Sequence, residues 1–308
     1  MGEAHQEAQL LGSAEIRQLA GRLGIRPAKR FGQNFVIDPG TIRRIVALAD
    51  LRPQDIVLEV GPGLGSLTLG LVEAAERVIA VEVDPVLAGE LPRTVAARAP
   101  ARAGRLEVVT ADALSLQAPP GQPPTALVAN LPYNVAVPVV LHLLEVMPSI
   151  VRALVMVQAE VADRMCAQPG SRTYGVPSVK LAWYGTARRA GTVSRSVFWP
   201  APNVDSALVA FTRWPDAGTP ADKLAAQPGR GQHSVTRTAV FAVIDAAFAQ
   251  RRKTLRSALA SWAGSAQAAE RVLRDAGVDP ALRGEAIGID QYIRIALAAS
   301  QARTIIES

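Results

Sequence analysis

The run Asn130-Leu131-Pro132-Tyr133 combines groups suited to recognising the amino group of a planar base. The apolar residues 126–129 predict a buried strand, so Asn130 falls at its carboxyl end, where open α/β sheets bind ligands. The side-chain carbonyl of Asn130 and the main-chain carbonyl of Leu131 can accept both N–H groups of an adenine amine. Tyr133 can stack on the ring, and Pro132 stiffens the turn. The alternative is an Asx-Pro turn with a core tyrosine.

A glycine turn follows an earlier predicted strand, residues 56–60. Gly61, Gly63 and Gly65 form a G-x-G-x-G pattern, and glycine is needed where a ligand touches the main chain. The dinucleotide fingerprint would require a further glycine where Ser66 stands. The pattern therefore predicts contact with a nucleoside that carries a zwitterionic tail, rather than with a pyrophosphate.

Acidic side chains end the next two predicted strands. Glu82 lies 21 residues after Gly61, where a carboxylate can accept from ribose hydroxyls. Asp112 ends the third strand and is placed to accept from an adenine amine. With Asn130, these residues occupy four successive strand ends. Together they predict a binding site for S-adenosylmethionine.

Strands and helices alternate from residue 55 onward, which predicts a doubly wound α/β sheet. The predicted strands are 56–60, 78–83, 106–109, 126–129, 154–157, 180–183 and 206–211. The predicted helices are 13–23 with Ser13 as N-cap, one opening at Asp38 or Pro39, 67–75 and 85–98.

The C-terminal third differs in pattern. Residues 214–235 are rich in Pro, Gly and Gln, which predicts a linker or a surface excursion. The sequence beyond predicts helices at 235–260, 266–276 and 289–301 and no strand. We therefore expect two domains: residues 1–213, an α/β domain with a helical and basic N-terminal extension, and residues 214–308, a helical domain.

The charge of the chain favours a polyanionic partner. Of the 308 residues, 49% are apolar and 19% charged, as in ordinary soluble domains with ample core. The net charge is +6 and the pI is about 10.0. Two long stretches, 16–37 and 164–204, contain basic but no acidic residues, and residues 251–256 form a third basic cluster. This distribution favours nucleic acid as the partner.

Several classes of site and location are excluded by composition. Cys166 is the single cysteine, and three scattered histidines lack metal-ligand spacing, so we expect no disulfide framework and no metal site. The N-terminus has no signal pattern, and polar residues interrupt the apolar stretch 135–157. The sequence therefore predicts a cytoplasmic protein without a membrane span.

The third basic cluster consists of Arg251, Arg252, Lys253 and Arg256. In the predicted helix, Arg252 and Arg256 are four residues apart and would share one face, with Lys253 beside them. Contact with RNA phosphates is the functional interpretation. A solvated helix face is the alternative.

Five sequence blocks together resemble the ribosomal RNA small-subunit (16S) adenine dimethyltransferases of the KsgA/RsmA type. They occur in order across nearly the whole chain, from about residue 25 to 300. They are RFGQNF at 30–35, EVGPG at 59–63, NLPYN at 130–134, VFWPAPNVDS at 197–206 and FAQRRKTL at 248–255.

The resemblance implies a Rossmann-like class I S-adenosylmethionine methyltransferase domain followed by a small all-helical domain. It implies dimethylation of adenines in 16S rRNA, with the 30S subunit or its assembly intermediate as partner and a monomeric enzyme. The cofactor residues that it implies are Asn34, Val36, Gly61, Gly63, Glu82, Asp112 and Asn130; many relatives have Leu where Val36 stands. The catalytic residues that it implies are Asn130, Leu131, Pro132, Tyr133 and Phe198, with Phe198 clamping the second face of a flipped-out adenine.

Two rival interpretations share this chemistry or fold. Large-subunit adenine methyltransferases of the macrolide-resistance type share the Asn-x-Pro-Tyr element, but the block at 248–255 favours the small-subunit type. Non-catalytic RNA-binding or assembly factors keep the fold, as the related mitochondrial transcription factors do. The intact cofactor and catalytic residues argue against such a loss.

Overall fold

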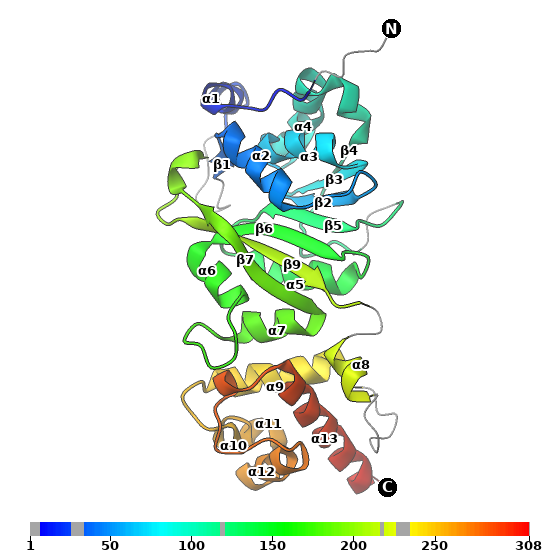
Figure 1. Ribbon diagram of the computed structural model, residues 1–308, viewed down its shortest axis with the longest axis vertical. Coiled ribbons are helices and arrows are strands. Elements are labelled where there is room, and N and C mark those ends of the chain that lie inside the picture. Colours follow the sequence, from blue (N-terminus) through cyan, green and yellow to red (C-terminus); the bar gives the residue numbers. More distant parts are fainter. Residues whose placement is uncertain (1–6, 26–33, 118–120, 216–218, 226–234, 308) are drawn as a thin grey trace. The chain divides into compact units, whose positions relative to one another are not determined.

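The computed structural model describes residues 7–25, 34–117, 121–215, 219–225 and 235–307. The chain divides into two compact units, one of residues 1–162 with 188–212 and one of residues 163–187 with 213–308 (Figure 1). The predicted domain boundary at residue 213 places residues 163–187 in the α/β domain instead. That boundary stays a prediction. Most of the predicted basic loop before Asn34 lies outside the described residues.

A seven-stranded sheet in the order β4-β3-β2-β5-β6-β9-β7 confirms the predicted doubly wound architecture (Figure 1). The first five strands of this order are parallel, and β9 runs antiparallel to β6. Because the order reverses between β2 and β5, a crevice opens at their carboxyl ends. The strands are β2 Ile56–Val60, β3 Arg77–Glu82, β4 Leu106–Thr110, β5 Ala126–Asn130, β6 Arg152–Gln158, β7 Gly185–Val193 and β9 Ser206–Arg213.

Helices of the first unit begin where the sequence supplies caps. The carboxylate of Asp38 accepts from the Thr41 N–H at 2.7 Å, and that of Asp84 accepts from the Val86 N–H at 2.9 Å. A proline follows each cap, at a position where its missing N–H costs nothing. The helices are α1 Ser13–Arg22, α2 Pro39–Leu48, α3 Ser66–Ala74, α4 Pro85–Arg98, α5 Ala136–Val146 and α6 Ala159–Met165, with 3-10 helices η2 Pro100–Arg105 and η3 Arg195–Val197.

A two-stranded antiparallel ribbon joins segments far apart in the sequence. It pairs β1, Phe35–Val36, with β8, Phe198–Trp199. The rings of Phe35 and Trp199 stack with centroids 6.4 Å apart. The ribbon thereby ties the segment before α2 to the segment before β9.

The second unit packs its helices around three aromatic side chains. Phe248 lies against Tyr174 and Tyr292, with ring centroids 6.3 and 6.4 Å away. The Tyr174 hydroxyl donates to the Ile287 carbonyl at 3.1 Å, and the Tyr292 hydroxyl donates to the Gly284 carbonyl at 2.9 Å. Burial raises the pKa of both phenols. The elements are α7 Val176–Tyr184, α8 Pro220–Ala225, α9 Arg237–Ala249, α10 Leu255–Ala258, α11 Ala260–Ala263, α12 Ala266–Asp275, η4 Gly284–Ala286 and α13 Ile289–Glu307.

The predicted strand at 180–183 is wrong, because these residues lie in helix α7. A four-residue apolar run does not distinguish a buried strand from a helix, whereas Pro177 in the first turn after Gly175 is a helix-start signal. Strand β7, which follows at once, has no predicted counterpart. Its Gly, Thr and Arg residues do not give an apolar alternation.

The predicted continuous helix over 235–260 is also wrong. Helix α9 ends at Ala249, and α10 begins at Leu255 after a turn. The Leu255 N–H donates to the Leu282 carbonyl at 2.6 Å, and the Arg256 N–H donates to the Pro280 carbonyl at 3.2 Å. These bonds replace the i to i−4 bonds that a continuing helix would make. Arg252 and Arg256 therefore do not share a helix face.

Smaller differences concern helix ends and the expected linker. Gly12, not Ser13, is the N-cap of α1, and the described part of 214–235 includes helix α8. Across the described ranges, every helix is too short or too polar to cross a bilayer. Within those ranges no three His, Cys, Asp or Glu side chains gather as metal ligands would.

Candidate active site

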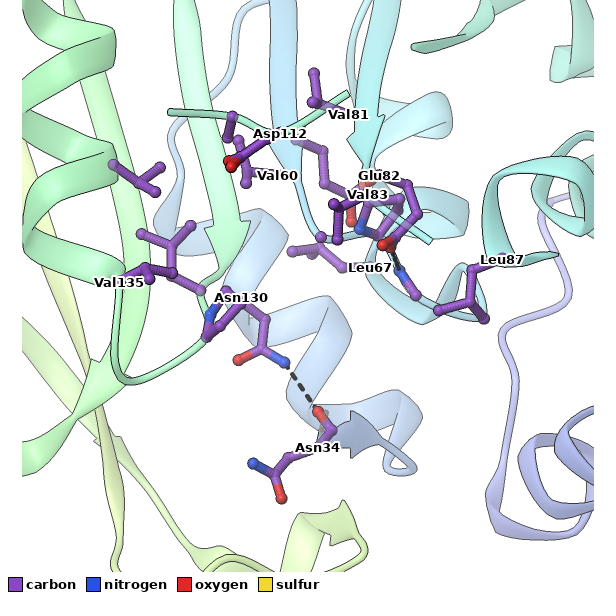
Figure 2. Close-up of a pocket in the computed structure, with 18 of the residues that line it drawn as sticks. Asn34, Val60, Leu67, Val81, Glu82, Val83, Leu87, Asp112, Asn130 and Val135 are labelled. Atoms are coloured by element: carbon purple, nitrogen blue, oxygen red, sulfur yellow. Dashed lines mark hydrogen bonds between the residues drawn. The ribbon is translucent and has the colours of Figure 1, made fainter. Parts of the chain in front are cut away.

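A cavity of about 310 Å³ opens at the carboxyl ends of the central strands (Figure 2). Its wall combines the β1 segment with the segments that follow β2, β3, β4 and β5. The sheet topology therefore brings together residues up to about a hundred positions apart. The predicted residues that line the cavity are Asn34, Val36, Gly61, Gly63, Glu82, Asp112, Asn130, Leu131, Pro132 and Tyr133.

The glycine turn after β2 brings main chain to the cavity surface. Gly61 and Gly63 have φ angles of +69° and +57°, a left-handed region that other residues adopt only at a cost. A Cβ atom on Gly63 would lie 2.9 Å from the Phe35 ring. The Gly63 N–H donates to the Glu82 carboxylate at 3.1 Å. The turn is thus held in a shape that only glycine fits.

Two buried carboxyl groups lie on the cavity wall. Glu82 also accepts from the Asp84 N–H at 3.0 Å, and burial raises its pKa despite these bonds. Glu59, which the sequence analysis did not single out as a site residue, is 1% exposed and accepts from the Thr68 hydroxyl at 2.7 Å. Burial, with the nearby Glu82 charge, raises the pKa of Glu59 to about 8. A lone acid in the apolar strand 56–60 is the signal that points to Glu59.

We expect Glu59→Gln to change how the stability of the cofactor-free protein depends on pH. The pKa of Glu59 is about 8 when folded and near 4.5 when unfolded, so the folded state holds the proton more tightly. The contribution of Glu59 to the free energy of unfolding is fully present below pH 4.5. It is lost as pH rises toward 8, by on the order of 1 kcal/mol per pH unit. Denaturant unfolding should show that the free energy of unfolding of the variant rises relative to that of the wild type between pH 5 and 8. The exposed Glu76→Gln is the control, and a pH-independent difference for Glu59→Gln would contradict the expectation.

The carboxamide of Asn130 is held in one orientation. Its Nδ2 donates to the main-chain carbonyl of Asn34 at 3.1 Å (Figure 2). Because a carbonyl can only accept, the amide nitrogen must face Asn34, and Oδ1 points away from it. The Leu131 N–H donates to the Met156 carbonyl of β6 at 3.1 Å, which fixes the main chain after β5. The result is an oriented acceptor on the cavity wall.

Tyr133 is also fixed by a contact across the sheet. Its hydroxyl lies 2.8 Å from the Ser206 hydroxyl at the start of β9, and Ser206 is fully buried. Burial raises the pKa of Tyr133, the Ser206 bond opposes this, and the Asp205 charge adds to it. The ring therefore stays neutral and is anchored at its far end.

Phe198 is the one predicted catalytic residue that the structure does not bring to the cavity. It lies in β8 opposite Val36 and is 3% exposed, within the core of the first unit. It is absent from the residues that line the cavity. Its role as a second stacking face stays a prediction.

An apolar rim that the sequence analysis did not single out borders the acidic strand ends. Val83 and Leu114 line the cavity yet are 57% and 40% exposed. Each follows shortly after a predicted acid, Glu82 or Asp112, and Asp112 Oδ1 accepts from the Leu114 N–H at 2.9 Å. Large apolar side chains one or two residues after a strand-end acid are the sequence signal for this rim.

Two of the four predicted RNA-binding side chains make hydrogen bonds or ion pairs within the second unit. Arg251 donates to the Glu285 carboxylate at 2.7 Å and to the Arg172 carbonyl at 2.6 Å. Arg256 pairs with Glu270 at 2.9 Å. The other two, Arg252 and Lys253, are exposed on the turn between α9 and α10.

Known sequences match this chain over most of its length. Residues 25–301 match the family model described as ribosomal RNA adenine dimethylase. The chain belongs to the ribosomal RNA adenine dimethylase family. A relative from Streptomyces avermitilis, named ribosomal RNA small subunit methyltransferase A, is 62% identical over 287 residues, 93% of each chain. A relative of the same name from Thermobifida fusca is 62% identical over 290 residues, 94% of this chain and 96% of its own.

Solved structures agree with this family assignment at the level of the fold. A dimethyladenosine transferase from Plasmodium falciparum aligns with a TM-score of 0.69 at 22% identity, over 86% of this chain and 96% of its own. The 23S rRNA methyltransferase ErmE aligns with a TM-score of 0.59 at 26% identity, over 87% of this chain and all of its own. The predicted methyltransferase fold and the predicted family are thus confirmed.

Proposed function

We propose that this dimethylase family member transfers methyl groups from S-adenosylmethionine to the exocyclic amines of two adjacent adenines near the 3′ end of 16S rRNA. Dimethyladenosine is the product, formed during small-subunit biogenesis. Relatives 62% identical to this chain carry the name ribosomal RNA small subunit methyltransferase A. The observation that carries the proposal is the oriented Asn130 acceptor beside Tyr133 on the cavity wall.

The cavity fits S-adenosylmethionine by the chemistry of its wall. Gly61 and Gly63 line the cavity without side chains of their own, so main chain forms this part of its wall and is available to a ligand. The Glu82 carboxylate suits ribose hydroxyls, and the apolar rim at Val83 and Leu114 suits an adenine ring. We propose that Asn34, Val36, Asp112 and Asn130 complete this site. When bound, the cofactor supplies a methyl group on sulfur that is already activated for transfer.

The protein's part in the reaction is to hold and polarise the adenine amine. The lone pair of that amine is delocalised into the ring, so it becomes nucleophilic only when the nitrogen pyramidalises. Asn130 Oδ1 and the Leu131 carbonyl, by accepting hydrogen bonds from its two N–H groups, favour that geometry and stabilise the charge that develops on nitrogen. Pro132 keeps the turn rigid, and Tyr133 stacks on the extruded base. No general base is needed before transfer, because the nitrogen–methyl bond forms as the sulfur–methyl bond breaks and the neutral thioether leaves. The charged methylated amine then releases its proton to water.

Small-subunit rRNA, within the 30S subunit or its assembly intermediate, is the proposed partner. The net charge of +6 suits a phosphate-rich surface, and Arg252 and Lys253 are exposed cations that can contact RNA, with Arg251 and Arg256 beside them. We propose a monomer acting in the cytoplasm, without metal. The alternative substrate is large-subunit rRNA, since the fold of ErmE is shared.

Methyl transfer to three substrates tests the proposal. Labelled S-adenosylmethionine is incubated with unmethylated small subunits, large subunits and protein-free RNA, and the rate of label incorporation is measured. We expect incorporation with small subunits and little with large subunits. Label in large-subunit RNA would favour the resistance-type enzyme, and particle binding without transfer would favour a non-catalytic assembly factor.

A further inference from the structure

Two arginine side chains of the first unit converge on one residue of the edge strand β7. Arg44 of α2 donates from Nη1 to the Thr192 carbonyl at 3.0 Å, and Arg189 of β7 donates from Nη2 to the Thr192 hydroxyl at 3.5 Å. Arg43 and Arg188, their neighbours in sequence, are exposed as well. Arg44 and Arg189 form a two-residue basic patch made by two elements that are distant in sequence.

Carboxylates close to the patch in sequence are engaged in backbone capping. Asp205 Oδ1 accepts from the Arg195 N–H at 3.0 Å, and Asp38 accepts from the Thr41 N–H. The Asp38 carboxylate is also close enough to Arg43 for that charge to lower its pKa. No acid occurs in the sequence between Asp163 and Asp205. Like charges held together at an exposed site repel, and an anion placed between them relieves that repulsion.

The patch is connected through the β1–β8 ribbon to the wall of the proposed methyl-transfer cavity. Strand β7 leads through η3 into β8, which pairs with β1, and Val36 of β1 lines the cavity. The Ile37 N–H donates to the Val197 carbonyl of η3 at 2.8 Å. Helix α2 begins at Pro39, directly beyond this bond. Each of the two elements that carry the arginines is therefore connected to the cavity wall by a short segment of chain or by the β1–β8 pairing.

We propose that Arg44 and Arg189 bind the sugar–phosphate backbone of the RNA strand next to the target adenine. The inference rests on the proposed function and adds a substrate surface on the first unit. Guanidinium forks match phosphate oxygens in geometry as well as charge. Charged residues also keep edge strands from pairing with other chains. That reason accounts for Arg188 and Arg189 but not for Arg44, which reaches the strand from α2.

The double variant Arg44→Gln with Arg189→Gln tests the patch by equilibrium binding at several salt concentrations. The probes are unmethylated small subunits and protein-free 16S rRNA. Losing two phosphate contacts should reduce the magnitude of the negative slope of log K, the association constant, against log salt by about 1.4. Binding at low salt should weaken about tenfold or more. Arg52→Gln is the control, because Arg52 is exposed and precedes the amino end of the central strand β2, whereas the cavity opens at the carboxyl ends.

Two further measurements separate charge from folding. S-adenosylmethionine affinity should stay at the wild-type value in the Gln variant, since the cavity is unchanged. Arg44→Lys with Arg189→Lys should retain most of the salt slope, which a purely structural role of the Thr192 contacts would not allow. If wild-type protein binds RNA and the Gln variant has the same slope, the patch proposal is wrong and the proposed function stands. A loss on particles but not on protein-free RNA would also overturn it, in favour of a ribosomal protein contact.

Discussion

Replacing Asn130 by alanine should lower the turnover number about 10²–10³-fold while S-adenosylmethionine affinity changes only a few-fold. The loss corresponds to removing one oriented dipole aimed at the charge that develops on the amine nitrogen. The Nδ2 bond to the Asn34 carbonyl shows that Oδ1 is held ready before the adenine arrives. Single-turnover methyl transfer, together with calorimetric titration of the cofactor, measures the two effects separately.

Asn203→Ala is the matched control for this substitution. Asn203 is exposed and does not line the cavity, and its main-chain carbonyl, not its side chain, accepts from Arg195 Nη1 at 3.4 Å. The same carboxamide is thus removed without touching the cavity. If the turnover number of Asn130→Ala stays within a few-fold of that of the wild type, Asn130 does not polarise the amine.

Replacing Tyr133 by alanine should have the second-largest effect, because it removes the stacking face for the extruded adenine. Base–aromatic stacking contributes about 1–3 kcal/mol per base, so kcat/KM for the RNA should fall about 10–100-fold. Tyr133→Phe keeps the ring and loses only the hydroxyl bond to Ser206, worth about 1 kcal/mol. Its kcat/KM should therefore fall only a few-fold. Steady-state kinetics with unmethylated small subunits give both values.

Ser206→Ala removes the same hydroxyl bond from the other side and is the control for Tyr133→Phe. Both variants should behave alike if the bond only anchors the ring. Equal losses in Tyr133→Ala and Tyr133→Phe would mean that the hydroxyl, rather than the aromatic face, matters for the substrate.

Much of the fold follows from short-range patterns in the sequence. Buried parallel strands appear as apolar runs, and glycines or acids at their carboxyl ends mark the cavity. This is why Gly61, Glu82, Asp112 and Asn130 are predicted together and why all of them line one cavity. Proline after Asp38 likewise marks the start of α2, because cap and proline are adjacent in sequence.

Features that depend on long-range partners are not visible in the sequence. The acceptor of the Asn130 amide is a carbonyl 96 positions away, and Ser206 lies 73 positions from Tyr133. Arg251 is bound by Glu285 and by a carbonyl from 79 positions earlier, so a basic run alone overstates the number of available cations. Phe198 is buried by its pairing with β1, a two-residue strand too short for any periodic pattern.

The most direct measurement is mass spectrometry of both nucleosides and sequence-specific nuclease fragments of small-subunit rRNA, after incubation of unmethylated particles with this protein and S-adenosylmethionine. We predict two dimethyladenosines per particle, adjacent and near the 3′ end, and almost none with Asn130→Ala. Methylation of another base or of another atom, or intact particle binding without any methylated adenine, would contradict the proposed amine chemistry of the cavity.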